Sequence, residues 1–148
     1  MDTVTTPLAI HRILFATDLR AASEAAAGQA IALASEHQAE LVVLNVIDPT
    51  VLRLPGGRFV RRVDQERARV EAAVQALVRR ARAEGAKATF LVWEGDPVEL
   101  ILAAAEAEGC DLIVVGSHRR GRLGRLLLGS VSASVVEQHP RRVVVVPA

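Results

Sequence analysis

Five short apolar runs occur along the chain, and each has the length of a β-strand. The runs are rich in β-branched residues and lack the alternation of apolar and polar positions that a half-exposed strand shows. Continuous runs of this kind are typical of strands that are covered on both faces. The expected strands are Ile13–Thr17, Leu41–Ile47, Ala88–Trp93, Leu112–Val115 and Val143–Val146.

Between these runs, apolar residues recur at three- and four-residue spacing, which predicts amphipathic helices. Asp96 and Pro97 mark one helix start, because Asp caps free backbone N–H groups and Pro fits the first turn. The expected helices run from Ala22 to near His37, from Val70 to a stop at Gly85, from Asp96 to Gly109, and from Gly129 to a point before Pro140.

The alternation of strands and helices predicts an α/β fold with parallel strands joined by right-handed crossovers. A length of 148 residues suits one domain, with a core over about residues 11–147. Pro49–Val63 is the longest unassigned stretch and is expected to be a loop. Ligands of such sheets bind beyond the carboxyl ends of the strands. The residues at those ends are Ala16–Asp18, Asp48–Pro49, Glu94–Asp96 and Gly116 onward.

Composition narrows the possible functions. A hydrophobic content of 51% excludes a disordered chain, and three Phe, one Trp and no Tyr argue against a nucleic-acid surface built on stacked rings. A net charge of +1 gives no field that would steer polyanions. The single cysteine, Cys110, excludes an internal disulfide framework, and the scattered histidines suggest no metal site. No apolar run approaches the ~20 residues of a membrane span, so a soluble cytoplasmic domain is expected.

The segment Gly116–Ser130 holds four glycines and four arginines, and it lies between an expected strand and an expected helix. Glycine lets the backbone approach a phosphate, helix N–H groups attract anions, and guanidinium groups suit phosphate oxygens. The alternative is a surface loop whose glycines only make turns. The segment has neither a Gly-Lys-Ser/Thr phosphate loop nor a dinucleotide fingerprint, and no base accompanies Ser130 to make it a nucleophile.

Asp18 follows the first expected strand and is a second candidate. Its carboxylate is placed to accept a hydrogen bond from a ribose hydroxyl or to hold a divalent cation beside phosphates. It is equally placed to cap N–H groups near Arg20 and Ala21. The two roles are compatible.

Several segments together resemble the universal stress protein family over nearly the whole chain. They are Thr17-Asp18, Asn45–Asp48, Val114–His118, Leu126–Val131 and Val143–Pro147. The resemblance implies a doubly wound five-stranded parallel sheet of order 3-2-1-4-5, a homodimer, and an adenine nucleotide such as ATP as ligand. A C-terminal edge strand of β-branched residues would itself favour pairing with a second copy.

The nucleotide-binding branch of that family carries the pattern Gly-x2-Gly-x9-Gly-Ser/Thr. Gly116, Gly129 and Ser130 match it, whereas Arg119 stands at the middle glycine and Arg20 stands where the family often has Ser. A side chain at Arg119 is unfavourable if the position needs positive φ or close approach to a phosphate. The resemblance implies these nucleotide contacts: Ala16, Thr17 and Asp18 at ribose and adenine, Leu41 at the adenine edge, Val115 under the base, and Gly129, Ser130 and Val131 at the phosphates, which would hold any Mg²⁺.

The first functional hypothesis is a dimeric, non-enzymatic stress-response protein that binds ATP, with at most slow hydrolysis. The second is a protein–protein interaction module of the same fold with an altered groove. An ATP pyrophosphatase is disfavoured because residues 16–22 lack a Ser-Gly-Gly loop. Arg119 is the residue that distinguishes the first two hypotheses.

Overall fold

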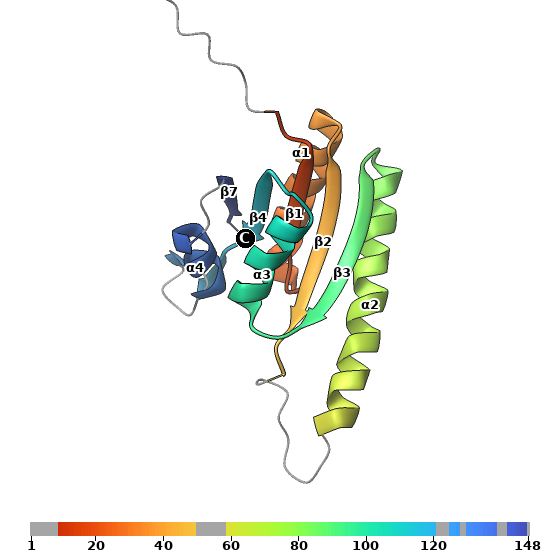
Figure 1. The fold of residues 1–148 in the computed structure, drawn as a ribbon, viewed down its shortest axis with the longest axis vertical. Helices are drawn as coiled ribbons and strands as arrows, with labels where there is room; N and C mark the ends of the chain where they lie inside the picture. The colour runs from red at the N-terminus through yellow and green to blue at the C-terminus, as the bar shows by residue number, and fades with distance from the viewer. Residues whose placement is uncertain (1–8, 50–58, 121–124, 128–129, 139–141, 148) are drawn as a thin grey trace, which may run out of the picture.

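The computed structural model describes residues 9–49, 59–120, 125–127, 130–138 and 142–147. Strands and helices alternate along most of the chain (Figure 1). The strands are β1 (Arg12–Ala16), β2 (Glu40–Ile47), β3 (Lys87–Glu94), β4 (Leu112–Gly116), β5 (His118–Arg120), β6 (Arg125–Leu127) and β7 (Arg142–Val146). The helices are a 3-10 turn η1 (Ala21–Ser23), α1 (Glu24–His37), α2 (Phe59–Ala83), α3 (Pro97–Ala107) and α4 (Ser130–Gln138).

The main sheet has five strands in the order β3-β2-β1-β4-β7, and all neighbours are parallel. In chain order this is 3-2-1-4-5, so the predicted doubly wound α/β fold is confirmed. The order reverses at β1, where the chain crosses first to β2 and later to β4. A crevice between diverging connections is expected at the carboxyl ends of β1 and β4.

Successive residues of each buried strand point to opposite faces of the sheet. Ile13 and Phe15 pack with α1 and α2 on one face, whereas Leu14 packs with α3 and α4 on the other. Each face has its own buried cluster, and helices cover both. Burial on both faces is the physical reason why the strands read as continuous apolar runs.

Two segments differ from the sequence predictions. Helix α2 begins at Phe59, so the end of the stretch expected as a loop, Pro49–Val63, is helical. Residues 50–58 lie outside the described part of the chain. The glycine-rich segment contains an antiparallel β5–β6 hairpin, in which His118 is opposite Leu127 and Arg119 is opposite Leu126. Short apolar or basic triplets of this kind carry too little periodicity to be distinguished from loop.

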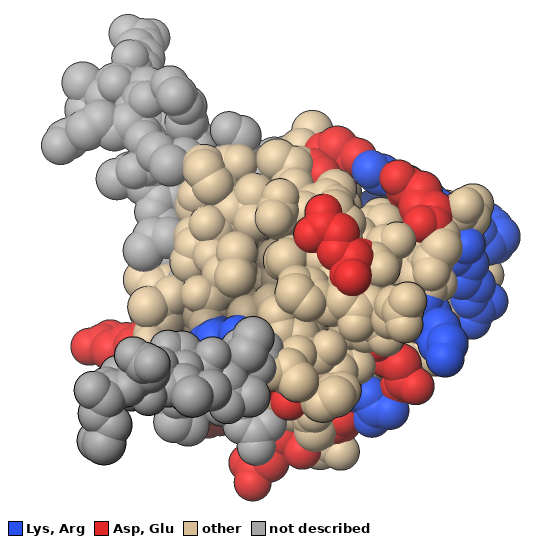
Figure 2. Space-filling view, turned by 90° about the horizontal axis from the view of Figure 1, so that it is seen from above, with Lys and Arg blue, Asp and Glu red and all other residues tan. Residues whose placement is uncertain are grey.

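The amino ends of the strands form the face that Figure 2 shows. Basic side chains gather on one side of it, over the end of α2, where Arg79, Arg80 and Arg82 lie. Arg80 is paired there with Glu24 and Glu84. Among the described residues, no helix is both long and apolar enough to cross a bilayer.

Helix α3 begins as the sequence predicted. Asp96 is its N-cap, Pro97 occupies the first turn, and the Asp96 carboxylate accepts a hydrogen bond from the Glu99 N–H at 3.0 Å. We expect Asp96→Ala to lower the free energy of unfolding by about 1 kcal/mol, because that N–H loses its partner. Urea denaturation measures the change. Asp96→Asn keeps the acceptor and should stay within a few tenths of a kcal/mol of the parent protein; an equal loss in both variants would contradict the capping role.

Candidate functional site

The β1–η1 connection forms a tight polar turn at the carboxyl end of β1. The Thr17 hydroxyl accepts a hydrogen bond from the Leu19 N–H at 3.0 Å, and the Asp18 carboxylate accepts one from the Arg20 N–H at 2.9 Å. Leu19 lies between them with a φ of 63°, a conformation that is uncommon for a branched side chain. Two local hydrogen bonds thus hold a strained turn, and strained turns cluster at binding sites.

The Asp18 carboxylate is half exposed and has a second partner, the Ser23 hydroxyl, at 2.6 Å. Asp18 thus accepts from the Arg20 N–H as predicted, one residue before η1, and the exposed part of the carboxylate stays accessible to a ligand. Ser23 was not predicted from the sequence. Its hydroxyl donates to Asp18. The family often has a Ser hydroxyl at position 20, where this chain has Arg.

Asn45 of β2 holds the same turn from the neighbouring strand. Its side-chain amide is buried and donates a hydrogen bond to the Thr17 carbonyl at 2.8 Å. That carbonyl lies beyond the last residue of β1, and the amide gives it a hydrogen-bond partner. The signal for Asn45 in the sequence was a lone polar residue inside an apolar run.

The end of β4 lies against the same turn through Ser23. A Cβ added to Gly116 would lie 3.8 Å from the Ser23 Oγ and 3.5 Å from the Ala26 Cβ, both ordinary contacts. Gly116 also has no positive φ in the left-handed region. Neither packing nor backbone conformation within the described residues therefore requires glycine at this position.

Ser117 is a further residue of this edge that was not predicted from the sequence. Its N–H donates to the Val146 carbonyl at 2.9 Å, which extends the β4–β7 ladder. Its side chain is 2% exposed, and among the described residues its hydroxyl has no hydrogen-bond partner. A buried hydroxyl without a partner is unfavourable unless another group completes its hydrogen bonding.

Arg119 lies in β5, where the backbone is extended. The middle position of the glycine pattern therefore does not adopt positive φ in this chain, and that part of the predicted steric conflict is absent. The other part, a clash between the Arg119 side chain and a phosphate that approaches the backbone, stays a prediction. Ser130 and Val131 begin α4 as expected, whereas Gly129 lies outside the described residues.

The predicted contact residues fall into two groups. Ala16 pairs with Val115 at the ends of β1 and β4, next to Thr17 and Gly116. Leu41 does not join them: it is buried near the amino end of β2, in register with Ile13 and Ala88. It lies three positions before Leu44, the partner of Ala16, which is a distance of about 10 Å along the strand. The structure therefore does not bring Leu41 together with the other predicted contact residues, and Asn45 and Val46 occupy that end of β2.

A hollow of about 220 Å³ adjoins the turn. Strand ends and α2 both contribute to it, so a helix that the sequence did not connect with the site forms one of its walls. The lining residues include Asp18, Arg20, Asn45, Val46, Glu66 and Arg69. Among the described residues, no group of three His, Cys, Asp or Glu side chains is arranged to hold a metal ion.

The fold and this edge define the class of protein: a doubly wound α/β domain with a polar turn, a glycine and a buried serine at the point where strand order reverses. The sequence profile of the Universal stress protein family matches residues 9–147. The chain belongs to the universal stress protein family.

Individual relatives agree with this assignment. The chain is 37% identical over 139 residues to a universal stress protein of Thermus aquaticus, covering 90% of this chain and 96% of the relative. Its structure resembles that of the universal stress protein UspA from Lactobacillus plantarum, with a TM-score of 0.80, 27% identity and coverage of 93% and 97%. It also resembles a universal stress protein solved in complex with cAMP, with a TM-score of 0.70, 26% identity and coverage of 94% and 98%.

Proposed function

We propose that this protein binds an adenine nucleotide, ATP, at the carboxyl edge of β1 and β4 and acts as a non-enzymatic, homodimeric stress-response protein. Ala16, Thr17 and Asp18 would contact ribose and base, and Val115 would lie under the base. Gly116, Arg119, Gly129, Ser130 and Val131 would border the phosphates, and the phosphates would hold any Mg²⁺.

The observation that carries the proposal is the junction at Ser23. Its hydroxyl contacts the Asp18 carboxylate, and the same side chain borders the face of Gly116 that lacks a Cβ. Asp18 and Gly116 are far apart in sequence, yet both are presented at one edge. The Asp18 carboxylate is suited to a sugar hydroxyl, and packing does not require glycine at position 116. A nucleotide can span these two residues.

The residues present fit a phosphate-bearing ligand. The Ser117 hydroxyl is buried and has no hydrogen-bond partner in the described part of the chain, and Ser130 begins α4, whose free N–H groups favour an anion. A related universal stress protein has been solved in complex with cAMP, an adenine nucleotide, which supports the ligand class.

The direct test is to denature the purified protein and to separate the released small molecules by chromatography. We expect ATP or ADP at near one per chain, or, from a protein purified empty, calorimetric heat on addition of Mg-ATP. Trp93 gives a second readout, since it is the single tryptophan and is in register with Val46 at the site. An empty eluate with neither heat nor a fluorescence change would contradict nucleotide binding.

The alternative function is a protein–protein interaction module of the same fold. It is favoured by one observation: Arg119 stands in the β5–β6 hairpin at the position where the nucleotide pattern has glycine. Under this function, the purified protein would bind no nucleotide.

Arg119→Gly separates the two possibilities. We expect it to strengthen Mg-ATP binding by a few-fold, because removing the side chain permits closer approach of a phosphate to the backbone. Titration calorimetry measures the dissociation constant. Arg120→Gly is a matched control in the same strand and should leave the affinity unchanged. Equal or weaker affinity in Arg119→Gly would refute the steric explanation.

A further inference from the structure

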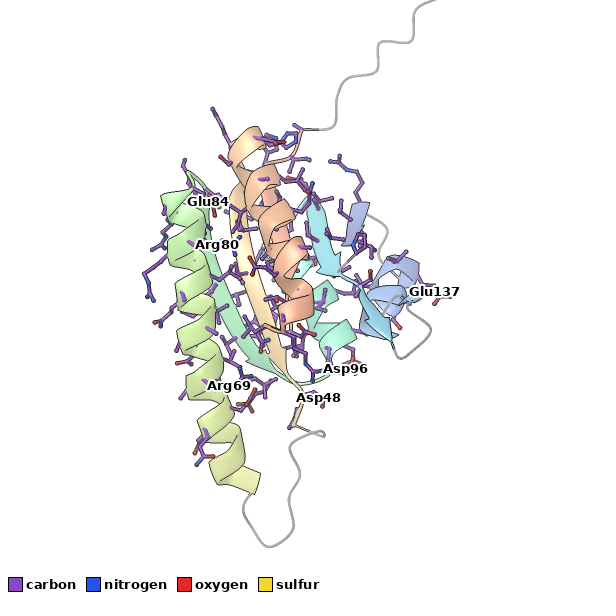
Figure 3. The ribbon with its side chains drawn as sticks, turned by 180° about the vertical axis from the view of Figure 1, so that it is seen from behind. Asp48, Arg69, Arg80, Glu84, Asp96 and Glu137 are labelled. Carbon is purple, nitrogen blue, oxygen red and sulfur yellow. The ribbon has the colours of Figure 1, made fainter. Side chains whose placement is uncertain are left out.

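The hollow between α2 and the end of β2 is too small for a whole nucleotide. Its volume is about 220 Å³, below the roughly 300–1,000 Å³ of pockets that enclose drug-sized ligands. The end of β2, at Val46 and Ile47, lines one part of it, and Glu66 and Arg69 of α2 line another. In Figure 3, Arg69 lies on the side of α2 that faces the end of β2, near Asp48. The hollow has room for one ring system.

The charges around this hollow disfavour a phosphate. Asp18, Asp48 and Glu66 contribute three carboxylates, against the two guanidinium groups of Arg20 and Arg69. Like charges repel at short range, so an anion would gain little there. A neutral flat ring with polar edges meets no such penalty, and of the parts of a nucleotide the base has that character.

Glu66 fixes the orientation of Arg69. One carboxylate oxygen accepts from Arg69 Nε at 3.2 Å, and the other accepts from a terminal guanidinium nitrogen. This two-point pairing sets the plane of the guanidinium group. The hydrogen bond to Glu66 also raises the pKa of Arg69 above its ordinary value, so the group stays charged. The Arg69 side chain remains 58% exposed, which leaves a surface open to a ligand.

We propose that Arg69, held by Glu66, stacks on the nucleobase of the bound nucleotide and presses it against Val46 and Ile47. Guanidinium groups stack on aromatic rings, and the described residues that line this hollow include no aromatic side chain. The inference rests on the proposed adenine-nucleotide binding and differs from it in one contact: the base lies at the end of β2, two strands away from Val115. It makes α2 part of the site and Arg69 a residue that distinguishes a nucleotide from a polyphosphate without a base.

The experiment compares two ligands, Mg-ATP and Mg-tripolyphosphate, by calorimetry on the full chain. Arg69→Lys keeps the charge but removes the planar group. We expect it to weaken Mg-ATP binding about 2- to 5-fold, because the stacking of the guanidinium plane is lost while the ammonium keeps part of the attraction to the ring, and to leave tripolyphosphate binding unchanged. Glu66→Gln removes the charge that orients the guanidinium group. It should weaken Mg-ATP binding by a smaller factor and leave tripolyphosphate binding unchanged. Arg79→Lys, an exposed position on the same helix, is the matched control and should change neither.

The outcomes separate this inference from the function on which it rests. If the parent protein binds Mg-ATP and Arg69→Lys binds it equally well, the stacking role is overturned and nucleotide binding stands. If Arg69→Lys weakens both ligands equally, Arg69 acts on phosphates and the stacking role is again overturned. If the parent protein binds no Mg-ATP, the proposed function fails and this inference fails with it. Thermal unfolding of each variant checks that α2 remains packed.

Discussion

Asp18→Ala is expected to weaken Mg-ATP binding about 10- to 150-fold. Hydrogen bonds to a charged group contribute about 1.5–3 kcal/mol, and the half-exposed Asp18 carboxylate is the acceptor proposed for the ribose hydroxyls. The substitution also removes the acceptor for the Arg20 N–H and the Ser23 hydroxyl. Calorimetric titration with Mg-ATP gives the change in affinity, and urea denaturation gives the change in stability.

Asp18→Asn is the control that separates the two roles of this side chain. Its amide oxygen can still accept from the Arg20 N–H, so the turn and the stability should be kept. Without the charge, its affinity should lie between those of the parent protein and Asp18→Ala. If Asp18→Ala lost stability but bound Mg-ATP normally, Asp18 would serve the turn only.

Val145→Pro is expected to convert the proposed homodimer into a monomer. Strand β7 is the last in the sheet, and within the described residues no strand pairs with its outer edge. The Val146 carbonyl accepts from the N–H of Ser117, directly after β4, so the backbone groups of Val145 point to the free edge. Proline removes the N–H that a second copy would use without breaking the internal ladder.

Two-fold symmetry makes this effect large. Each lost hydrogen bond occurs twice in an isologous dimer, and a backbone group left without a partner costs about 1–3 kcal/mol. The dimer should therefore weaken by about 2–6 kcal/mol, enough to shift micromolar protein to monomer in light scattering. Val145→Ile keeps the N–H and should stay dimeric. A parent protein that is already monomeric at micromolar concentration would show that β7 does not mediate self-association.

The strands and most of the helices could be predicted from the sequence because the burial of a segment is reflected in its own pattern of apolar and polar residues. The run Leu41–Ile47 is apolar except at Asn45 since both of its faces are covered, and Asp96-Pro97 marks a helix start through the chemistry of its own turn. The ends of β1 and β4 were located in the same way, so Thr17, Asp18 and Gly116 could be assigned to the site. The order 3-2-1-4-5 came from the family resemblance, and the pairing of the strands confirms it.

Contacts between residues far apart in the chain could not be predicted, because no local pattern indicates them. Leu41 and Asn45 lie in one apolar run, and only the register against β1 places the first at the amino end and the second at the site. Ser23 reaches Asp18 because a 3-10 turn precedes α1, and Asn45 reaches the Thr17 carbonyl across 28 positions. The extended backbone at Arg119 depends on pairing with β6.

By itself, the sequence determined which segments are buried, where each strand ends, and that an aspartate and a glycine stand at those ends. These properties depend on periodicity and on short-range backbone chemistry, which each segment carries alone. Only the tertiary structure decided which side chains meet at the edge. That choice depends on strand register and on the direction in which α2 presents Glu66 and Arg69, and both are set by packing between segments that are far apart in the chain.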